Sequence, residues 1–490
     1  MRFQNDPGGH RLPVKLDTTS NGEYAPIPLE PVHREARAHA MQTATTNARR
    51  LGLQRREFLV SACGVATSLL GMNAAYARAG RTGGYFEVPT LAALEEPLAR
   101  AAVSGDEFIF DVQGHFVNPT GAWLRELPAG ARPMRSFTAD ARCEPHAAGP
   151  GELDYLRCIG PDQFVKDVFM DSDTDLMVLS FVPSTPEGEP LKIEEAEATA
   201  RVVERLEGTH RLYIHGRVNP NQPGDLERMD LLAERHKVSA WKTYTQWGPE
   251  QKGFWMDDEP GLALIEKARK LGIRNIAIHK GLSFGPQSYE HSTCRDIGRV
   301  AKRFPDVNFL IYHSGFVANA KEGPYDPKRT DGVDALVTSL LENGVKPGSN
   351  VYAELGSTWR LCMRDPDTAA HTLGKLIRHC GESNVLWGTD SIWYGSPQDQ
   401  IQAFRTFQIS PELRERHGYP EITPQLRAKI FGLNALRIYP VPRDVLGEHL
   451  ERDRVATARA EYRERPDPAF VTYGPKNRRE FLNLLALGGG

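Results

Sequence analysis

From about residue 85 onward, short apolar runs alternate with longer amphipathic segments. The apolar runs lie at 108–111, 176–182, 212–218, 238–244, 275–279, 308–313, 351–355 and 385–390. Helical patterns separate them, at 194–206, 224–236, 261–271, 294–303, 332–341, 368–379 and 399–407. Strands that are apolar throughout and joined by helices indicate a parallel sheet buried on both faces. Eight such units predict an α/β fold, a (β/α)8 TIM barrel rather than an open doubly wound sheet.

The spacing between the first two strands is the exception to this pattern. Residues 116–172 form a long insertion rich in Gly, Pro and Arg, and a loop of that length is usually a lid or a binding wall. The barrel is expected to span residues 80–440 and to close with a helix at 423–437. A C-terminal extension follows at 441–490. It could cover the barrel of its own chain or that of a neighbouring subunit, so both a monomer and a homo-oligomer are compatible with the sequence.

Residues 1–79 have the pattern of a targeting segment. Residues 1–54 are polar and lack apolar periodicity, so they are expected to be a disordered n-region. A modest apolar run follows at 61–75, with small-residue sites after it at Ala77 and Ala79. The run is too short and too polar to span a bilayer. The pattern therefore predicts a signal peptide removed near either alanine.

The sequence Arg55-Arg56-Glu57-Phe58-Leu59 resembles a twin-arginine (Tat) signal, which predicts export to the periplasm by the Tat machinery. The same pentapeptide recurs at 478–482, near the other end of the chain. The export prediction therefore depends on the apolar run that follows and not on the arginines alone. The start of an ordinary amphipathic helix is the alternative.

Charge and cysteine content exclude some classes of partner. The formal net charge is −3, so no basic surface indicates a nucleic-acid partner. The six cysteines show no CxxC or CxxH spacing, which argues against a zinc ribbon or a disulfide scaffold. Cys143 and Cys158 could pair in an exported protein, and two unpaired thiols are equally expected. No stretch elsewhere is long and apolar enough to make a stable membrane span.

Polar side chains follow several of the predicted strands. Gln113 and His115 end the first strand, His279 the fifth, His313 the sixth and Asp390 the eighth. A lone histidine at a strand end is more often structural than a ligand, but these ends all meet at one rim of a barrel. Imidazole and carboxylate groups suit zinc and similar divalent metals, which can activate a water at an open position.

These motifs resemble the amidohydrolase superfamily, in particular the amidohydrolase-related branch that contains non-oxidative decarboxylases of the aminocarboxymuconate-semialdehyde type. The resemblance covers about residues 105–440, and its motifs lie at 111–115, 279, 313–315, 388–390 and 429–434. It implies that His115, His279 and Asp390 bind one divalent metal ion, zinc or alternatively manganese. It also implies that His313 is the catalytic acid–base group and that Asp390 handles a proton.

Gln113 departs from the family pattern, in which the first strand ends His-x-His and both histidines bind metal. A glutamine carbonyl is a neutral and weaker ligand than imidazole. Gln113 could still coordinate a metal through its oxygen. It could lie behind a three-ligand site of His115, His279 and Asp390, which is the preferred interpretation. Or the barrel could lack a metal altogether.

Four further residues are candidates for substrate binding. Lys242 on the fourth strand is expected to bind a substrate carboxylate or to pair with Glu354 at the end of the seventh. Arg217 is either an anion clamp or a structural partner, with no preference. Trp393 could form a wall for an aromatic substrate, although a single tryptophan is more often core packing.

The main functional hypothesis is a metal-dependent hydrolase that cleaves a C–N or C–O bond of a small molecule with a metal-activated water. The alternative is a non-oxidative decarboxylase of an aromatic or unsaturated acid on the same scaffold. A binding protein without catalytic activity is the lesser alternative, suggested by Gln113 alone.

Overall fold

The computed structural model describes residues 3–119, 158–182, 184, 188–207, 210–282, 289–446 and 448–487. Most of the predicted insertion at 116–172 lies outside these residues, so its role as a lid stays a prediction. Cys143 lies outside them as well, and its pairing with Cys158 also stays a prediction. Four other cysteines are free and buried, namely Cys63, Cys294, Cys362 and Cys380.

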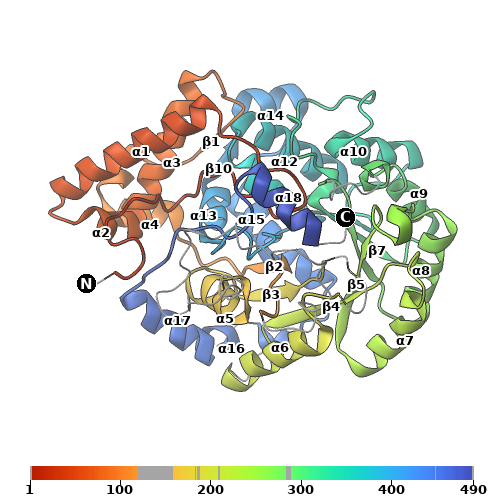
Figure 1. Ribbon diagram of the computed structural model, residues 1–490. Coiled ribbons are helices and arrows are strands. Elements are labelled where there is room, and N and C mark those ends of the chain that lie inside the picture. Colours follow the sequence, from red (N-terminus) through yellow and green to blue (C-terminus); the bar gives the residue numbers. More distant parts are fainter. Residues whose placement is uncertain are drawn as a thin grey trace.

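Eight parallel strands form the barrel in sequence order (Figure 1). They are β2 (Phe110–Gly114), β3 (Leu176–Leu179), β4 (Leu212–Arg217), β5 (Val238–Tyr244), β6 (Asn275–His279), β7 (Asn308–Tyr312), β8 (Val351–Glu354) and β9 (Val385–Leu386). Backbone hydrogen bonds of 3.0 Å from Val112 to Trp387 and of 2.9 Å from Asp390 to Gln113 join the first strand to the last. The predicted (β/α)8 barrel is confirmed.

Helices surround the barrel in the alternation that the sequence predicts. They include α5 (Pro161–Val165), α6 (Ile193–Glu207), α7 (Asp225–Arg235), α8 (Glu259–Lys270), α9 (Ile297–Arg303), α10 (Gly332–Asn343), α11 (Thr358–Cys362), α12 (Pro366–Cys380), α13 (Gln398–Thr406) and α14 (Pro411–His417). The predicted closing helix begins as α15 (Pro424–Ala428) and continues as a π-helical turn at Lys429–Leu433.

Alternate residues of the strands fill the barrel interior with apolar side chains. Phe110, Val112, Leu176, Val178 and Leu310 belong to this cluster, all fully buried. Tyr439 and Ala435, which follow the closing helix, pack against the same cluster. Because apolar groups fill the interior, polar side chains that need a cavity lie near the carboxyl ends of the strands.

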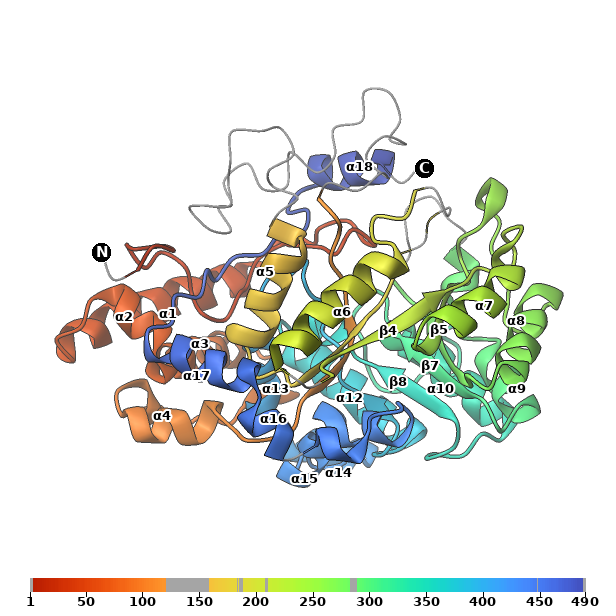
Figure 2. The ribbon, with the colours of Figure 1, turned by 90° about the horizontal axis from the view of Figure 1, so that it is seen from below.

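The N-terminal region folds onto the side of the barrel (Figures 1 and 2). It contains α1 (Pro31–Arg50), α2 (Arg55–Val60), α3 (Ala62–Arg78), α4 (Glu96–Val103) and strand β1 (Gly84–Phe86), which pairs with β10 (Phe407–Ile409). The structure therefore differs from the expectation that residues 1–54 are disordered. Their few apolar side chains are supplemented by buried ion pairs, such as that of Lys15 with Asp399 at 2.9 Å.

The run that resembles a signal peptide has a structural use in this fold. Ser61 caps the first turn of α3 by accepting a hydrogen bond from the backbone of Gly64. Gly71 lets α3 cross α1 closely, since a Cβ added there would lie 2.9 Å from that of Ala40. Arg56 is buried and pairs with Asp467 at 3.3 Å. Export through the Tat route stays a prediction.

The C-terminal extension packs on this chain's own barrel. It contains α16 (Glu448–Arg452), α17 (Arg454–Glu464) and α18 (Arg478–Leu487), and Figure 2 shows α18 above the barrel. Arg211 at the start of the β4 region donates two hydrogen bonds of 2.7 Å to Asp453. Among the described helices, none is both long and apolar enough to cross a membrane.

Candidate functional site

The strand ends place the predicted residues in one buried region. His279 is the last residue of β6, and His313 follows β7 directly. Gln113 lies in β2, His115 follows that strand, and Asp390 follows β9. All five side chains are at most 4% exposed. The structure therefore gathers every residue predicted as a metal ligand or a catalytic group.

Several residues of this region have an unusual backbone conformation. The φ angle is 63° at His313, 53° at Ser314, 53° at Ser357 and 58° at Asp390. A left-handed backbone at a non-glycine residue costs about 1–3 kcal/mol and is concentrated at functional sites. A hydrogen bond of 2.7 Å from the hydroxyl of Ser314 to the carbonyl of Glu354 helps to hold one of these turns.

Asp390, His115 and Gln113 form the first of two neighbouring groups. Oδ1 of Asp390 lies 3.1 Å from Nε2 of His115 and 3.2 Å from Nε2 of Gln113. Burial works to raise the pKa of Asp390, but its hydrogen bond and charge interaction with His115 outweigh burial and hold the pKa below its ordinary value. Asp390 is therefore ionised at neutral pH, which suits a metal ligand or a general base.

The second group joins two predicted residues to one from the N-terminal region. Oε1 of Glu23 lies 3.3 Å from Nδ1 of His279, and Oε2 of Glu23 lies 3.4 Å from Nε2 of His313. One ligand atom from each of these three buried residues lies within 4.8 Å of the other two. Asn21 connects the two groups, because its side-chain N–H donates hydrogen bonds of 2.6 Å to Glu23 and to Asp390.

The hydrogen bonds of the histidines define which ring nitrogen is free. One ring nitrogen lies within 2.9 Å of a backbone carbonyl in each case: Nδ1 of His115 at Ser180, Nε2 of His279 at Leu282 and Nδ1 of His313 at Gly356. A carbonyl can only accept, so these nitrogens carry the proton. In His279 and His313 the opposite nitrogen presents a lone pair, whereas Nε2 of His115 faces the carboxylate of Asp390. Burial lowers the pKa of His279 well below its usual range and that of His313 to about 4. Both rings are therefore neutral at pH 7.

This arrangement fits a divalent cation. Nδ1 of His279 and Nε2 of His313 have no hydrogen-bond partner among the described residues, and both face the carboxylate of Glu23. Lone pairs and a carboxylate repel one another unless a proton or a metal cation lies between them. Burial and the charge of Asp390 raise the pKa of Glu23 well above its usual range, which shows how strongly this place favours a positive partner for the carboxylate. Two ligands that bind zinc at about 2.0–2.1 Å in a tetrahedral arrangement lie roughly 3.3–3.4 Å apart. Each histidine nitrogen lies at such a distance from one oxygen of Glu23, His279 from Oε1 and His313 from Oε2.

Lys242 and Glu354 are buried beside these groups, but no ion pair joins them in the part of the chain described. Glu354 instead accepts hydrogen bonds from the backbone of Gly356 at 2.6 Å and of His313 at 3.1 Å. Nζ of Lys242 lies 3.8 Å from the ring centre of Tyr312. Burial raises the pKa of Glu354 to about 8 and lowers that of Lys242 to about 7. The ion-pair alternative for Lys242 is therefore not what the structure shows.

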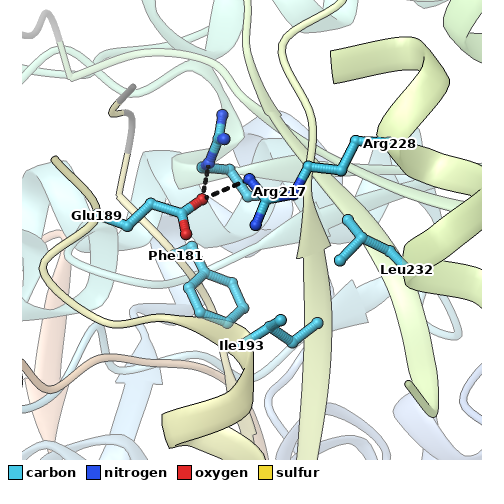
Figure 3. A pocket seen from close by; sticks show the side chains of 6 residues that line it. All are labelled: Phe181, Glu189, Ile193, Arg217, Arg228 and Leu232. Carbon is cyan, nitrogen blue, oxygen red and sulfur yellow. Dashed lines mark hydrogen bonds and ion pairs between the residues drawn. The ribbon is translucent and has the colours of Figure 1, made fainter. Parts of the chain in front are cut away.

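Arg217 is held away from these groups by two carboxylates. It pairs with Glu189 at 2.6 Å and with Asp225 at 2.8 Å, and Figure 3 shows it beside Glu189 and Arg228. Of the two roles that the sequence left open for Arg217, anion clamp and structural partner, these ion pairs correspond to the structural one. Trp393 is buried under the C-terminal extension, where its carbonyl accepts backbone hydrogen bonds from Tyr473 and Gly474.

Sequence reasoning missed Glu23 and Asn21. They lie in a coil of the N-terminal region, where no strand end or periodic pattern points to a site. The Asn-Gly pair at 21–22 indicates a turn and nothing more. Ser357, whose hydroxyl lies 2.5 Å from Asp390 and 2.6 Å from the hydroxyl of Tyr394, was missed as well.

Solved structures with a similar barrel include several decarboxylases. The 5-carboxyvanillate decarboxylase LigW of Sphingomonas paucimobilis is 15% identical, with 69% of this chain and 100% of that chain covered and a TM-score of 0.41. The 2,6-dihydroxybenzoate decarboxylase of Rhizobium is 14% identical, with 68% and 98% covered and a TM-score of 0.39. A dihydroxybenzoic acid decarboxylase of Polaromonas sp. JS666, solved with manganese and 2-nitroresorcinol, is 12% identical, with 70% and 99% covered and a TM-score of 0.41. No curated protein matches the chain.

A family model described as Amidohydrolase matches residues 110–441, which is more than half of the chain. The match runs from β2, the first strand of the barrel, to the end of the closing helical segment. It includes His115, His279, His313 and Asp390, the strand-end residues of both groups. The chain therefore belongs to the amidohydrolase family.

Proposed function

We propose that the chain is a metal-dependent enzyme that removes the carboxylate of a small organic acid as carbon dioxide. The observation that carries the metal requirement is the convergence of two imidazole lone pairs on the carboxylate of Glu23. Asp390 and His115 add a second oxygen and nitrogen next to them. Bound there, a zinc or manganese ion would supply positive charge for a substrate carboxylate or an adjacent oxygen.

Two features favour decarboxylation over hydrolysis, the main hypothesis from the sequence. The polar groups are closed off by the chain itself, since Glu23 and Asn21 are each only 6% exposed. Exclusion of water protects a carbanion-like reaction centre. Lys242 is a buried amine with no hydrogen-bond partner among the described residues, and its Nζ lies 4.7 Å from the ring centre of Tyr244 and 3.8 Å from that of Tyr312. An aromatic acid would offer it both a carboxylate and a ring to contact.

The reaction then requires one proton and no water. The bond between the substrate carbon and its carboxylate breaks, its electron pair stays on that carbon, and a proton replaces the departing carbon dioxide. Asp390 is held ionised by His115 and suits orientation or metal binding. Glu354, with a pKa raised by burial to about 8, carries a proton at neutral pH and is the better proton reservoir.

Product analysis in ¹⁸O-labelled water distinguishes the two reactions. The full chain, stripped with a chelator and reloaded with zinc or manganese, is incubated with aromatic carboxylic acids and, separately, with amides and lactones. Metal-dependent release of carbon dioxide with no ¹⁸O in the remaining product is expected. Incorporation of ¹⁸O into an acid product would show hydrolysis instead. Turnover that is unchanged after metal removal would refute the metal requirement.

A further inference from the structure

The site is completed by a part of the chain that the amidohydrolase match does not include. Glu23 and Asn21 precede residue 110, where that match begins. Their segment, residues 15–24, is a coil that precedes α1 in the chain and reaches the strand ends of the barrel. The hydrogen bonds of Asn21 to Glu23 and to Asp390 place the segment among the strand-end residues. A coil from outside the region that matches the family thus supplies a carboxylate to the group of strand-end residues.

The segment is anchored at several points and not merely laid across the opening. Lys15 pairs with Asp399 at 2.9 Å, and Asp17 pairs with Arg360 at 2.8 Å. The hydroxyl of Thr19 bonds to that of Thr472 in the C-terminal extension at 2.6 Å. The segment is therefore held between the barrel and the extension, which limits the freedom of the Glu23 side chain.

Glu23 offers a charged oxygen ligand, and Gln113 a neutral one. At position 113 a neutral amide stands where the family pattern has an imidazole; its N–H donates to Asp390, and its buried oxygen has no hydrogen-bond partner among the described residues. The carboxylate of Glu23 lies within 3.4 Å of the free nitrogens of both His279 and His313. An ionised carboxylate is also a stronger ligand for zinc or manganese than an amide oxygen.

We propose that Glu23 is a resident metal ligand, together with His279 and His313, and that residues 15–24 are a permanent part of the enzyme. This rests on the metal-dependent function proposed above. Removal of residues 1–79 at the predicted cleavage sites would separate Glu23 and Asn21 from the barrel. The metal-containing protein accordingly keeps residue 23, in the intact chain or in a bound fragment.

Metal binding to full-length variants tests the assignment without a substrate. Glu23→Gln keeps the size of the side chain and removes its charge, and Glu23→Ala removes the group. Glu35→Gln is the matched control, because Glu35 lies on α1, is half exposed and pairs with Arg78. The affinity for zinc and the visible absorption of the cobalt-substituted protein are measured for each, with circular dichroism to confirm folding.

Wild type and Glu35→Gln are expected to bind one metal per chain with the same affinity and cobalt spectrum. Both Glu23 variants should bind at least tenfold more weakly and show a changed cobalt spectrum, since a ligand is lost. Unchanged affinity and spectrum in Glu23→Gln would overturn the assignment and leave the metal-dependent function intact. No metal in the wild type would refute both. Faster turnover in Glu23→Ala with metal affinity retained would show a blocking segment instead and would also overturn it.

Intact mass spectrometry under native conditions tests the retention of the segment. The metal-containing species is expected to include residues 15–24, either in one chain or as a bound fragment. A folded, metal-containing chain that begins after residue 79, with no fragment attached, would refute this part of the inference.

Discussion

The side chain of Asn21 donates a hydrogen bond of 2.6 Å to the carboxylate of Asp390, which joins the N-terminal region to the last strand end of the barrel. The same N–H group also contacts Glu23 at 2.6 Å. Asn21 thus separates two carboxylates that would otherwise repel each other in a buried place. Its amide donates to both carboxyl groups in the metal-free protein.

Replacement of Asn21 by aspartate should make the fold depend on metal. Asn21→Asp removes a buried donor and adds a third buried carboxyl group beside Glu23 and Asp390, so the metal-free protein should lose about 1–3 kcal/mol of unfolding free energy. Zinc or manganese should restore more stability to the variant than to wild type. Chemical denaturation with and without metal measures this. Asn343→Asp, at the end of α10, is the control, and equal losses in the two variants would contradict the role given to Asn21.

Both histidines that face Glu23 should be needed for metal binding. The resemblance assigned His279 to the metal and His313 to acid–base chemistry alone, whereas the structure gives each one a free nitrogen beside the same carboxylate. His279→Ala and His313→Ala are each expected to lower metal affinity more than tenfold.

His215→Gln provides the control for these histidine variants. His215 is a buried barrel histidine whose ring nitrogens lie 3.2 Å from the hydroxyl of Ser180 and 3.1 Å from that of Tyr439. The His215→Gln variant should be less stable than wild type and should keep its metal. Full metal content in His313→Ala, measured after dialysis, would return His313 to a purely catalytic role.

Glu354 should give the metal-free protein a specific dependence on pH. Burial raises its pKa from 4.5 to about 8, so between these values the folded chain holds a proton that the unfolded chain has released. Its contribution to stability is therefore present below about pH 4.5 and is lost as pH rises through 8, by at most about 1.4 kcal/mol per pH unit.

Glu354→Gln isolates this contribution, because other buried groups titrate in both proteins. The unfolding free energy of wild type minus that of the variant should fall between pH 5 and pH 8, as measured by denaturation at several pH values. The pKa of His313 is lowered to about 4, so its contribution to stability increases as pH rises towards 6.5, opposite to that of Glu354. Because both proteins contain His313, this contribution cancels in the difference. A difference that is constant with pH would show that Glu354 is not protonated in the folded chain.

Arg56 should stabilise the fold more than its neighbour Arg55. The Arg56 side chain is buried, pairs with Asp467 at 3.3 Å and lies 4.7 Å from the ring centre of Phe470. Arg56→Ala removes a buried side chain together with its ion pair to Asp467 and its hydrogen bond to the carbonyl of Pro468, and should cost about 3 kcal/mol. Arg55→Ala should cost about 1 kcal/mol or less, since its contacts are near the surface. Equal effects in thermal or chemical denaturation would contradict the structural role of Arg56.

The sequence predicted the barrel and its strand-end residues for a physical reason. Eight apolar runs separated by helical patterns leave few other architectures, and parallel strands bring their carboxyl ends to one rim. His115, His279, His313 and Asp390 were found because each follows such a run. Position along the chain fixes their position in space only because the sheet is regular.

Glu23 could not be found in this way. It lies in a coil whose place is decided by tertiary contacts, such as those of Asp17 with Arg360 and of Thr19 with Thr472. The same segment is polar, and low hydrophobicity was the basis for expecting disorder. Buried ion pairs and the close crossing of α1 and α3 through Gly71 replaced the missing apolar side chains.

Position 113 offers a test of how the two groups share the metal. Nε2 of Gln113 lies 3.2 Å from Asp390 and 3.5 Å from Nε2 of His115, so a ring at this position would add a nitrogen donor to that pair. Gln113→His should therefore create a second set of ligands beside Glu23, His279 and His313. Elemental analysis is expected to rise from about one to about two zinc ions per chain, while Gln113→Asn stays at about one. One metal in Gln113→His, bound more tightly than in wild type, would mean that both groups hold a single shared ion.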